Sequence, residues 1–138
     1  MSNTWVIENQ TAGDDLQIER DIGDIDPLDP LIKAWLTVKA KMSDTDAQAA
    51  LQKIITNAAV PGVGQITEDG SELAGNGTGT TIFQITAAET AALGTVIRYF
   101  YDIQGKSATG KIYTSEHPDT GVAVSRMQFR QGATDATS

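Results

Sequence analysis

The sequence predicts a mainly all-β fold, a sandwich of antiparallel sheets with one inserted helix. Residues 32–42 alternate apolar and polar side chains at a period of two, which places successive side chains on opposite faces of a strand. Several other short segments show strand patterns between turn signals rich in Gly, Pro and Asp. Residues 81–104 predict a strand, one capped helical turn and a tyrosine-bearing strand, a succession typical of the crossing between the sheets of an immunoglobulin-like sandwich. We therefore expect an immunoglobulin-like β-sandwich, with an OB-like barrel as the alternative.

Composition narrows the classes of partner. The 138 residues hold 18 acidic and 10 basic side chains, a formal net charge of −8, and 40% of them are hydrophobic. This length and apolar content suit a single domain with one core. The acidic balance disfavours nucleic acids and anionic membranes, since both attract concentrated Lys and Arg. The sequence has no cysteine, no secretory leader and no apolar run near the ~20 residues that span a bilayer. We expect a soluble protein with no nucleic acid or membrane partner.

The chain divides into an arm, the sandwich and a tail. Residues 1–13 contain the apolar patch Trp5-Val6-Ile7 and are predicted to be an N-terminal arm, either an edge strand or a segment that docks on a neighbour. The sandwich is expected over 14–131 and a flexible C-terminal tail over 132–138. Within the sandwich, alternation predicts a half-buried strand at 16–22, and two prolines indicate a turn at 23–30.

The strand at 32–42 and the segment after it have different periods. One face of the strand is apolar: Ile32, Ala34, Leu36, Val38, Ala40 and Met42. The other face is polar apart from a tryptophan: Lys33, Trp35, Thr37, Lys39 and Lys41. After the N-cap candidate Ser43, apolar residues recur at helical spacing: Ala47, Ala50, Leu51, Ile54 and Ile55. This pattern predicts an amphipathic helix over about 44–56.

The second half of the chain is predicted to be strands with one helical turn. The strands are expected at 64–67, 81–86, 96–104, 110–116 and 121–130. Between the second and third of them, Thr86 and Glu89 have the spacing of a capping box over the turn 87–93. Tyr99, or else Tyr101, is expected to pack its ring in the core and to donate a hydrogen bond from its hydroxyl back to the crossing.

The residues with chemical potential do not form a catalytic pattern. The acids near the N-terminus offer oxygen ligands for a hard cation, but their spacing does not match a calcium loop: Asp14, Asp15, Asp21, Asp24, Asp26 and Asp29. His117 is the only histidine, and no nucleophile-elbow sequence accompanies it. The glycine-rich segment 74–80 lacks a phosphate-binding motif. We therefore expect no enzyme activity, no metal and no cofactor.

Three aromatic residues are candidates for an interface. Trp5, Trp35 and Phe100 fall on segments or strand faces that need not belong to the core. Aromatic side chains concentrate binding energy when they lie at a protein interface. The alternative is that they form a second, smaller core under the arm or the helix.

Two stretches resemble a known family. IKAWLTVKAKMSDTDAQAALQKII, residues 32–55, and FQITAAETAALGTVIRYFYDIQGKSATGKIYT, residues 83–114, resemble the immunoglobulin-like N-terminal domain of phage baseplate upper proteins and its small relatives in phage structural gene clusters. The resemblance covers most of residues 16–130 and implies a non-enzymatic structural protein of the virion. Larger members of the family continue into a receptor-binding or oligomerising region, and a stand-alone copy is more typical of an accessory protein.

The resemblance leads to specific expectations about partners. The favoured role is a capsid cement or decoration protein that binds the particle surface. The expected partners are other phage structural proteins, either the major capsid protein or tail and baseplate subunits, and further copies of the chain in a homo-oligomer. The alternatives are a baseplate or tail accessory subunit and a module that binds host glycans.

Overall fold

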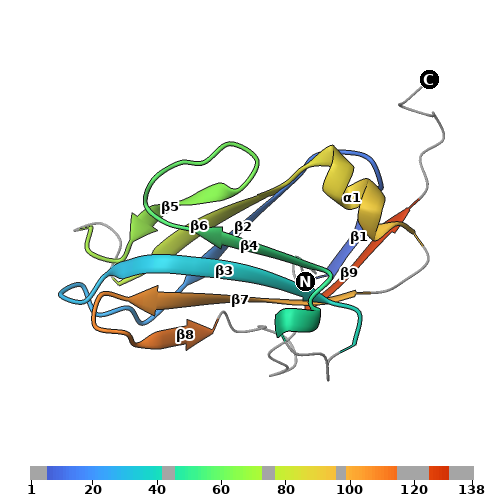
Figure 1. The fold of residues 1–138 in the computed structure, drawn as a ribbon. Coiled ribbons are helices and arrows are strands. Elements are labelled where there is room, and N and C mark those ends of the chain that lie inside the picture. The colour runs from blue at the N-terminus through green and yellow to red at the C-terminus, as the bar shows by residue number, and fades with distance from the viewer. Residues whose placement is uncertain (1–5, 42–45, 73–76, 96–98, 115–124, 131–138) are drawn as a thin grey trace.

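The chain folds into two sheets packed face to face, as the computed structural model in Figure 1 shows. The structure describes residues 6–41, 46–72, 77–95, 99–114 and 125–130. The larger sheet contains, in spatial order, β1 (Val6–Thr11), β9 (Ser125–Arg130), β7 (Tyr99–Ser107), β3 (Leu31–Lys39) and β4 (Leu51–Ile55), and β8 (Ile112–Thr114) also pairs with β7. The smaller sheet contains β2 (Leu16–Ile22), β6 (Gly79–Ile85) and β5 (Gly64–Asp69). The predicted all-β sandwich is confirmed.

The order of the strands is that of an immunoglobulin-like sandwich. β2-β6-β5 takes the places of strands B, E and D, and β9-β7-β3-β4 takes those of G, F, C and C′. The described strand pairs are antiparallel except for β1, which runs parallel to β9. Residues 6–11 of the predicted arm are therefore an edge strand of the larger sheet, the first of the two alternatives for this segment.

Two segments share the edge of β7 that faces away from β3. β8 pairs with Gln104–Lys106 of β7, and β9 pairs with Tyr99–Tyr101. β3 occupies the opposite edge of β7 along its whole length, so β8 and β9 lie one after the other on the same edge. The segment after Thr114, which is longer than a simple hairpin needs, separates the two pieces, and residues 115–124 lie outside the described residues.

The core lies between the two sheets and follows the alternation of the strands. Ala34, Leu36 and Val38 of β3 are fully buried, as predicted, and belong to the same core as Phe83 and Ile85 of β6. The pairing of β3 with β7 has an irregularity between Leu31 and Lys33. Because of this bulge, Leu31 is buried in place of Ile32, which is 44% exposed instead of lying on the inner face.

The predicted helix over 44–56 is wrong. The described part of that segment contains a short 3-10 helix, η1 (Asp46–Gln48), followed by β4. Ile55 pairs with Ala34 and Leu51 with Val38, so β4 extends the larger sheet. A short apolar run has no unique period, and here strand pairing and the β-branched Ile54-Ile55 outweigh the helical spacing of the alanines. Ser43 and Asp44, the predicted helix start, lie outside the described residues.

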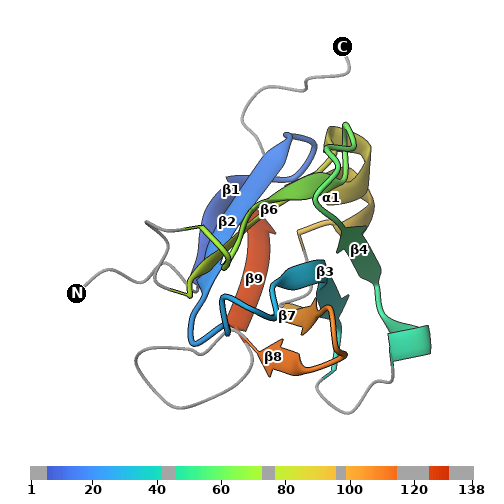
Figure 2. The same cartoon turned by 90° about the vertical axis from the view of Figure 1, so that its left-hand side faces the viewer.

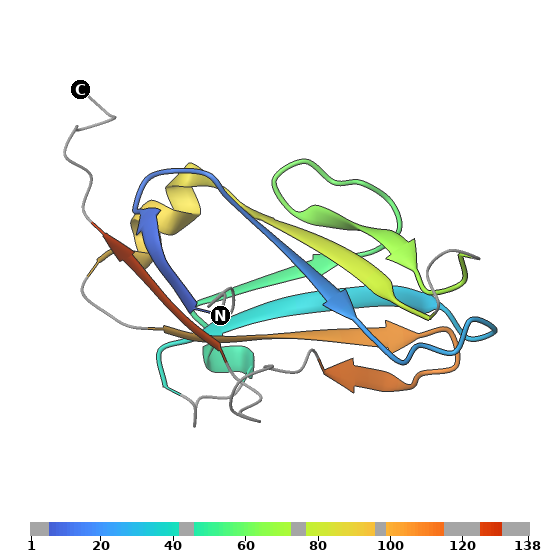
Figure 3. The same cartoon turned by 180° about the vertical axis from the view of Figure 1, so that it is seen from behind.

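The crossing between the sheets is made by α1 (Ala87–Leu93), at the end of the sandwich opposite the β7–β8 hairpin (Figure 3). Thr86 caps α1 and forms the predicted capping box with Glu89. Immediately after the crossing, the Tyr99 hydroxyl donates a hydrogen bond of 2.7 Å to the Leu93 carbonyl, as predicted for the first-choice tyrosine. Tyr101 has a different partner, since its hydroxyl accepts a hydrogen bond from Arg20 of β2 at 3.0 Å. No helix within the described residues is long and apolar enough to cross a membrane.

We predict that Tyr99→Phe destabilises the fold by about 1–3 kcal/mol, because the buried Leu93 carbonyl loses its side-chain donor while the ring stays in place. Urea denaturation measures the difference in the free energy of unfolding. Tyr113→Phe is the matched control: the Tyr113 hydroxyl is also buried but has no hydrogen-bond partner within the described residues, so its loss costs nothing or is slightly stabilising. Equal effects of the two substitutions would contradict the tyrosine corner.

Candidate functional site

Trp35 lies on the outer face of the larger sheet. Its cross-strand neighbours are Ile54 of β4 and Gln104 of β7. Trp35 is half-buried, whereas Ile54 is 48% exposed, so the row presents an aromatic and an aliphatic side chain to solvent. The Lys33 ammonium lies 5.8 Å from the centroid of the Trp35 ring, a cation–π contact that holds the lysine over the tryptophan.

Phe100 lies on the same outer face, further along the sheet. It is half-buried on β7 and pairs with Lys39 of β3. Between it and Trp35 is the row that contains Thr37, whose hydroxyl accepts a hydrogen bond from the Gln52 amide at 3.1 Å. The structure therefore brings two of the three aromatic interface candidates onto one face. Trp5, the third, lies outside the described residues.

We call this surface the Trp35 face and define it by Lys33, Trp35, Ile54, Phe100, Gln104 and Lys106. Lys106 of β7 is exposed and is the direct cross-strand neighbour of Lys33. Beside it Ile112 of β8 is 50% exposed. Protein interfaces typically place aromatic and aliphatic anchor residues, which contribute most of the binding free energy, inside a rim of polar groups. The Trp35 face has this composition.

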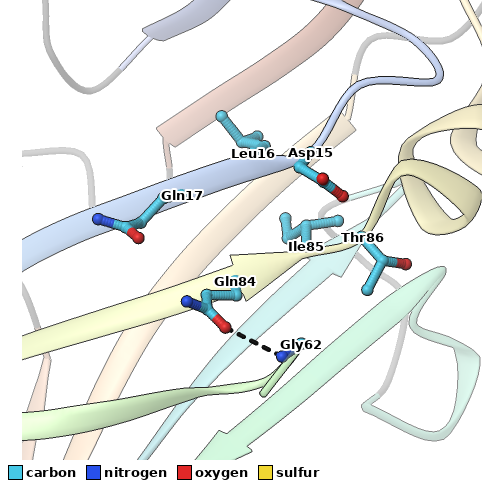
Figure 4. A pocket seen from close by; sticks show the side chains of 7 residues that line it. All are labelled: Asp15, Leu16, Gln17, Gly62, Gln84, Ile85 and Thr86. Carbon is cyan, nitrogen blue, oxygen red and sulfur yellow. Dashed lines mark hydrogen bonds between the residues drawn. The ribbon is translucent and has the colours of Figure 1, made fainter. Parts of the chain in front are cut away.

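The outside of the smaller sheet carries a shallow groove (Figure 4). The β4–β5 loop folds back over β6, where the amide N–H of Gly62 donates to the side-chain oxygen of Gln84 at 2.9 Å. Two adjoining hollows of about 310 and 400 Å³ share Gln17, Gly62 and Gln84 and so form one groove. Its further lining includes Val60, Pro61, Gln65 and Ile82.

The groove has little capacity for acid–base chemistry. Its described lining consists of apolar side chains, glycines, glutamine amides and the Thr86 side chain, with Asp15 as the single carboxylate. Asp15 accepts a hydrogen bond from the Ala87 amide at 2.8 Å and so helps to hold the start of α1. The groove exists because the chain at Gly64 passes against β6: a Cβ there would lie 2.0 Å from the Ile82 carbonyl oxygen, and φ is +132°. Only glycine fits this approach.

Several of the acids considered as cation ligands accept hydrogen bonds that serve local structure. Asp26 accepts from the Leu28 amide at 2.9 Å, and Asp21 accepts from the Thr80 hydroxyl at 3.1 Å. Asp29 holds the β7–β8 hairpin, because its carboxylate accepts from the Ser107 hydroxyl and from both the amide and the hydroxyl of Thr109. Hydrogen bonding from Thr109 lowers the pKa of Asp29 below its ordinary value. Within the described residues no group of three or more His, Asp or Glu side chains is arranged to hold a metal ion, and His117 lies outside them.

An ion pair links Lys53 of β4 to Glu89 of α1. The predicted helix over 44–56 does not reveal this pair, because a helix would not place Lys53 on the inner face of a strand. Lys53 points between the sheets and its side chain is only 8% exposed. Its ammonium donates to the Glu89 carboxylate at 2.5 Å and to the Gly62 carbonyl at 2.8 Å. The same carboxylate oxygen accepts from the Thr86 amide at 2.9 Å. Treating 51–55 as a strand places Lys53 on the inner face with Leu51 and Ile55, which is the pattern that reveals the pair.

The charge state of Glu89 reflects these contacts. Burial raises the pKa of its carboxyl, but hydrogen bonds from Lys53 and Thr86 outweigh burial, and the pKa lies below its ordinary value. The ion pair is therefore formed at neutral pH, and it joins the β4–β5 loop, β4 and the crossing between the sheets.

Comparisons with protein-family models, with curated proteins and with solved structures found no match.

We predict that Glu89→Gln destabilises the protein by about 2 kcal/mol at pH 7, because the buried Lys53 ammonium loses its counter-charge. Since the pKa of Glu89 is lowered by folding, its stabilisation is complete above the unfolded-state pKa and is lost as the pH falls through the folded-state pKa. The difference between wild type and Glu89→Gln in urea denaturation should therefore be constant above about pH 5 and shrink towards pH 3.

The double variant Lys53→Met with Glu89→Gln provides the control. It removes both charges and should be more stable than Glu89→Gln alone, since no unpaired ammonium stays buried. If the double variant loses as much as the sum of the two single variants, the pair makes no coupled contribution.

Proposed function

We propose that the chain is a non-enzymatic structural protein of a bacteriophage particle, a cement or decoration protein that binds the particle surface through the Trp35 face. The phage context rests on the resemblance of residues 32–55 and 83–114 to phage structural domains. The observation that carries the binding role is the Trp35 face itself, where Trp35 and Ile54 stand side by side on the outside of a sheet.

The position of this face suits a protein that adds interface area. β3 and β7 form the centre of the larger sheet and are held by their neighbours on both edges, so their outward side chains are presented on a rigid platform. Anchors on a rigid sheet lose little conformational entropy on binding. The face is also the part of the surface where Lys33 and Lys106 stand together in a chain of net charge −8, which favours an acidic patch on the partner.

Two alternative functions have specific support. A baseplate or tail accessory subunit would use the same face and the same resemblance, and differs only in the partner. A host-glycan-binding module is favoured by the neighbourhood of Trp35, because Gln104 and Thr114 continue its cross-strand row with hydrogen-bonding groups beside the aromatic ring.

We expect the protein to co-purify with phage heads in high copy, and particles stripped of it to lose resistance to heat or osmotic shock. Trp35→Ala should weaken rebinding to stripped heads at least tenfold, since an interface tryptophan contributes roughly 2 kcal/mol or more. Leu28→Ala is the matched control, because Leu28 is 93% exposed but lies on the β2–β3 loop and is not one of the residues that form the Trp35 face. If only a few copies per particle are found, at the tail, the cement role is contradicted and the baseplate alternative is supported.

The glycan alternative predicts retention of the purified protein on immobilised host polysaccharide. Loss of that retention in Trp35→Ala, with Leu28→Ala unaffected, is the expected outcome if the module binds sugars through the tryptophan. Unretained wild-type protein excludes the alternative for that polysaccharide.

A further inference from the structure

The two outer faces of the sandwich carry opposite charge. On the larger sheet, Lys33 and Lys106 are exposed and directly opposite each other on neighbouring strands. Like charges in this position repel, so the pair is stabilised by any anionic group placed above it. On the smaller sheet, exposed carboxylates come from Glu19 and Asp21 of β2 and from Glu68 of β5.

The side chains of each face are ordered in cross-strand rows. On the larger sheet the Lys33–Lys106 row is followed by the row of Ile54, Trp35 and Gln104. On the smaller sheet Asp21 and Glu68 both pair with Thr80 and form one row. The following row there is Glu19, Ile82 and Gln65. Each face thus has a charged row followed by a row with an apolar centre.

The two charged rows lie at the same end of the sandwich. Leu31 and Ile22 meet across the core at Gly105, where an added Cβ would come within 2.8 Å of Leu31 and 3.0 Å of Ile22. Gly105 precedes Lys106, and Ile22 follows Asp21. Figure 2 shows this end of the molecule, with β3, β7 and β8 below β2 and β6. A copy shifted along the direction perpendicular to the sheets therefore brings its lysine row to the end of the sandwich that carries the carboxylate row.

We infer that a Trp35 face that is not bound to the particle binds the smaller-sheet face of a second copy of this chain. The arrangement is heterologous: each copy uses its Trp35 face for one neighbour and its carboxylate face for the other, which generates rings or open stacks rather than a closed dimer. This inference rests on the proposed function in taking the Trp35 face as a protein-binding surface, and it names the occupant.

The expected contact is small and dependent on salt. The smaller sheet limits the contact: three strands at about 4.8 Å spacing and about six residues of length give a face of roughly 300 Å², below the ~800 Å² per partner of a standard interface. The association is therefore expected to be weak and to require high local concentration. Because its charged row is solvent-accessible, it should fade as the Debye length falls from about 10 Å at 0.1 M to about 3 Å at 1 M salt.

Sedimentation velocity on the purified chain tests the inference. Wild-type protein should associate at about 1 mM in low salt and dissociate in high salt. Lys33→Glu with Lys106→Glu makes both faces acidic, and Asp21→Lys with Glu68→Lys makes both basic, so each double variant alone should be monomeric. An equimolar mixture should associate again, since the faces are then complementary between the two variants. Both variants remain net negative, so overall attraction of opposite net charges does not explain recovery in the mixture.

Lys33→Arg with Lys106→Arg keeps the charges and should associate like wild type, which separates a charge effect from a loss of folding. A mixture that stays monomeric, or wild-type protein that is monomeric at millimolar concentration in low salt, overturns the inference. If the chain binds particles but remains monomeric, the proposed function stands and only the inference of a second copy is overturned. If the chain self-associates but does not bind particles, the inference of a second copy stands and the proposed function is overturned.

Discussion

The crossing between the sheets, from Ile85 at the end of β6 to Tyr99 at the start of β7, is the constraint on which the arrangement of the molecule depends. One carboxylate, that of Glu89, both completes the cap of α1 at Thr86 and holds Lys53 of β4. The Tyr99 hydroxyl fixes the other end of the helix at Leu93. These contacts set where β7 enters the larger sheet, and β7 in turn aligns β3, β8 and β9. The crossing therefore also helps to position the Trp35 face and the β4–β5 loop at Gly62.

Much of the fold was predictable where local signals and tertiary packing agree. The inner residues of β3, the capping box and the tyrosine of the crossing follow from period-two alternation and from hydrogen-bonding chemistry that acts over a few residues. The segment 51–55 was assigned incorrectly, because a five-residue strand flanked by alanines matches a helix as well as a strand. Its pairing with β3 is a long-range contact, and one sequence does not reveal which strand edge stays open. The same reason hides the ion pair of Lys53.

The candidate surfaces were also predictable only in part. That Trp35 points away from the core was predictable from its position between inward-facing residues of the strand. Its cross-strand neighbours Ile54 and Gln104 depend on register, and so does the juxtaposition of Lys33 with Lys106. The acids between Asp14 and Asp29 look in sequence like a single turn-rich cluster. In the fold they divide between loop anchors such as Asp29 and the outward row of Asp21 on β2. Strand register determines which charged residues share a face, and in this fold it gives the two outer faces opposite charge.

The inward direction of Lys53 has a consequence for behaviour at high concentration. β4 is the last strand of the larger sheet on its side. Its outer backbone edge has no partner strand among the described residues and is a template for the strand of another molecule. A further strand that extended the sheet would crowd a charged ammonium already committed to Glu89 and Gly62. An inward charge on a short border strand is one of the devices by which β proteins avoid aggregation through their edges. Strand addition at the β4 edge is thereby disfavoured, while the broad outer faces stay accessible for specific contacts.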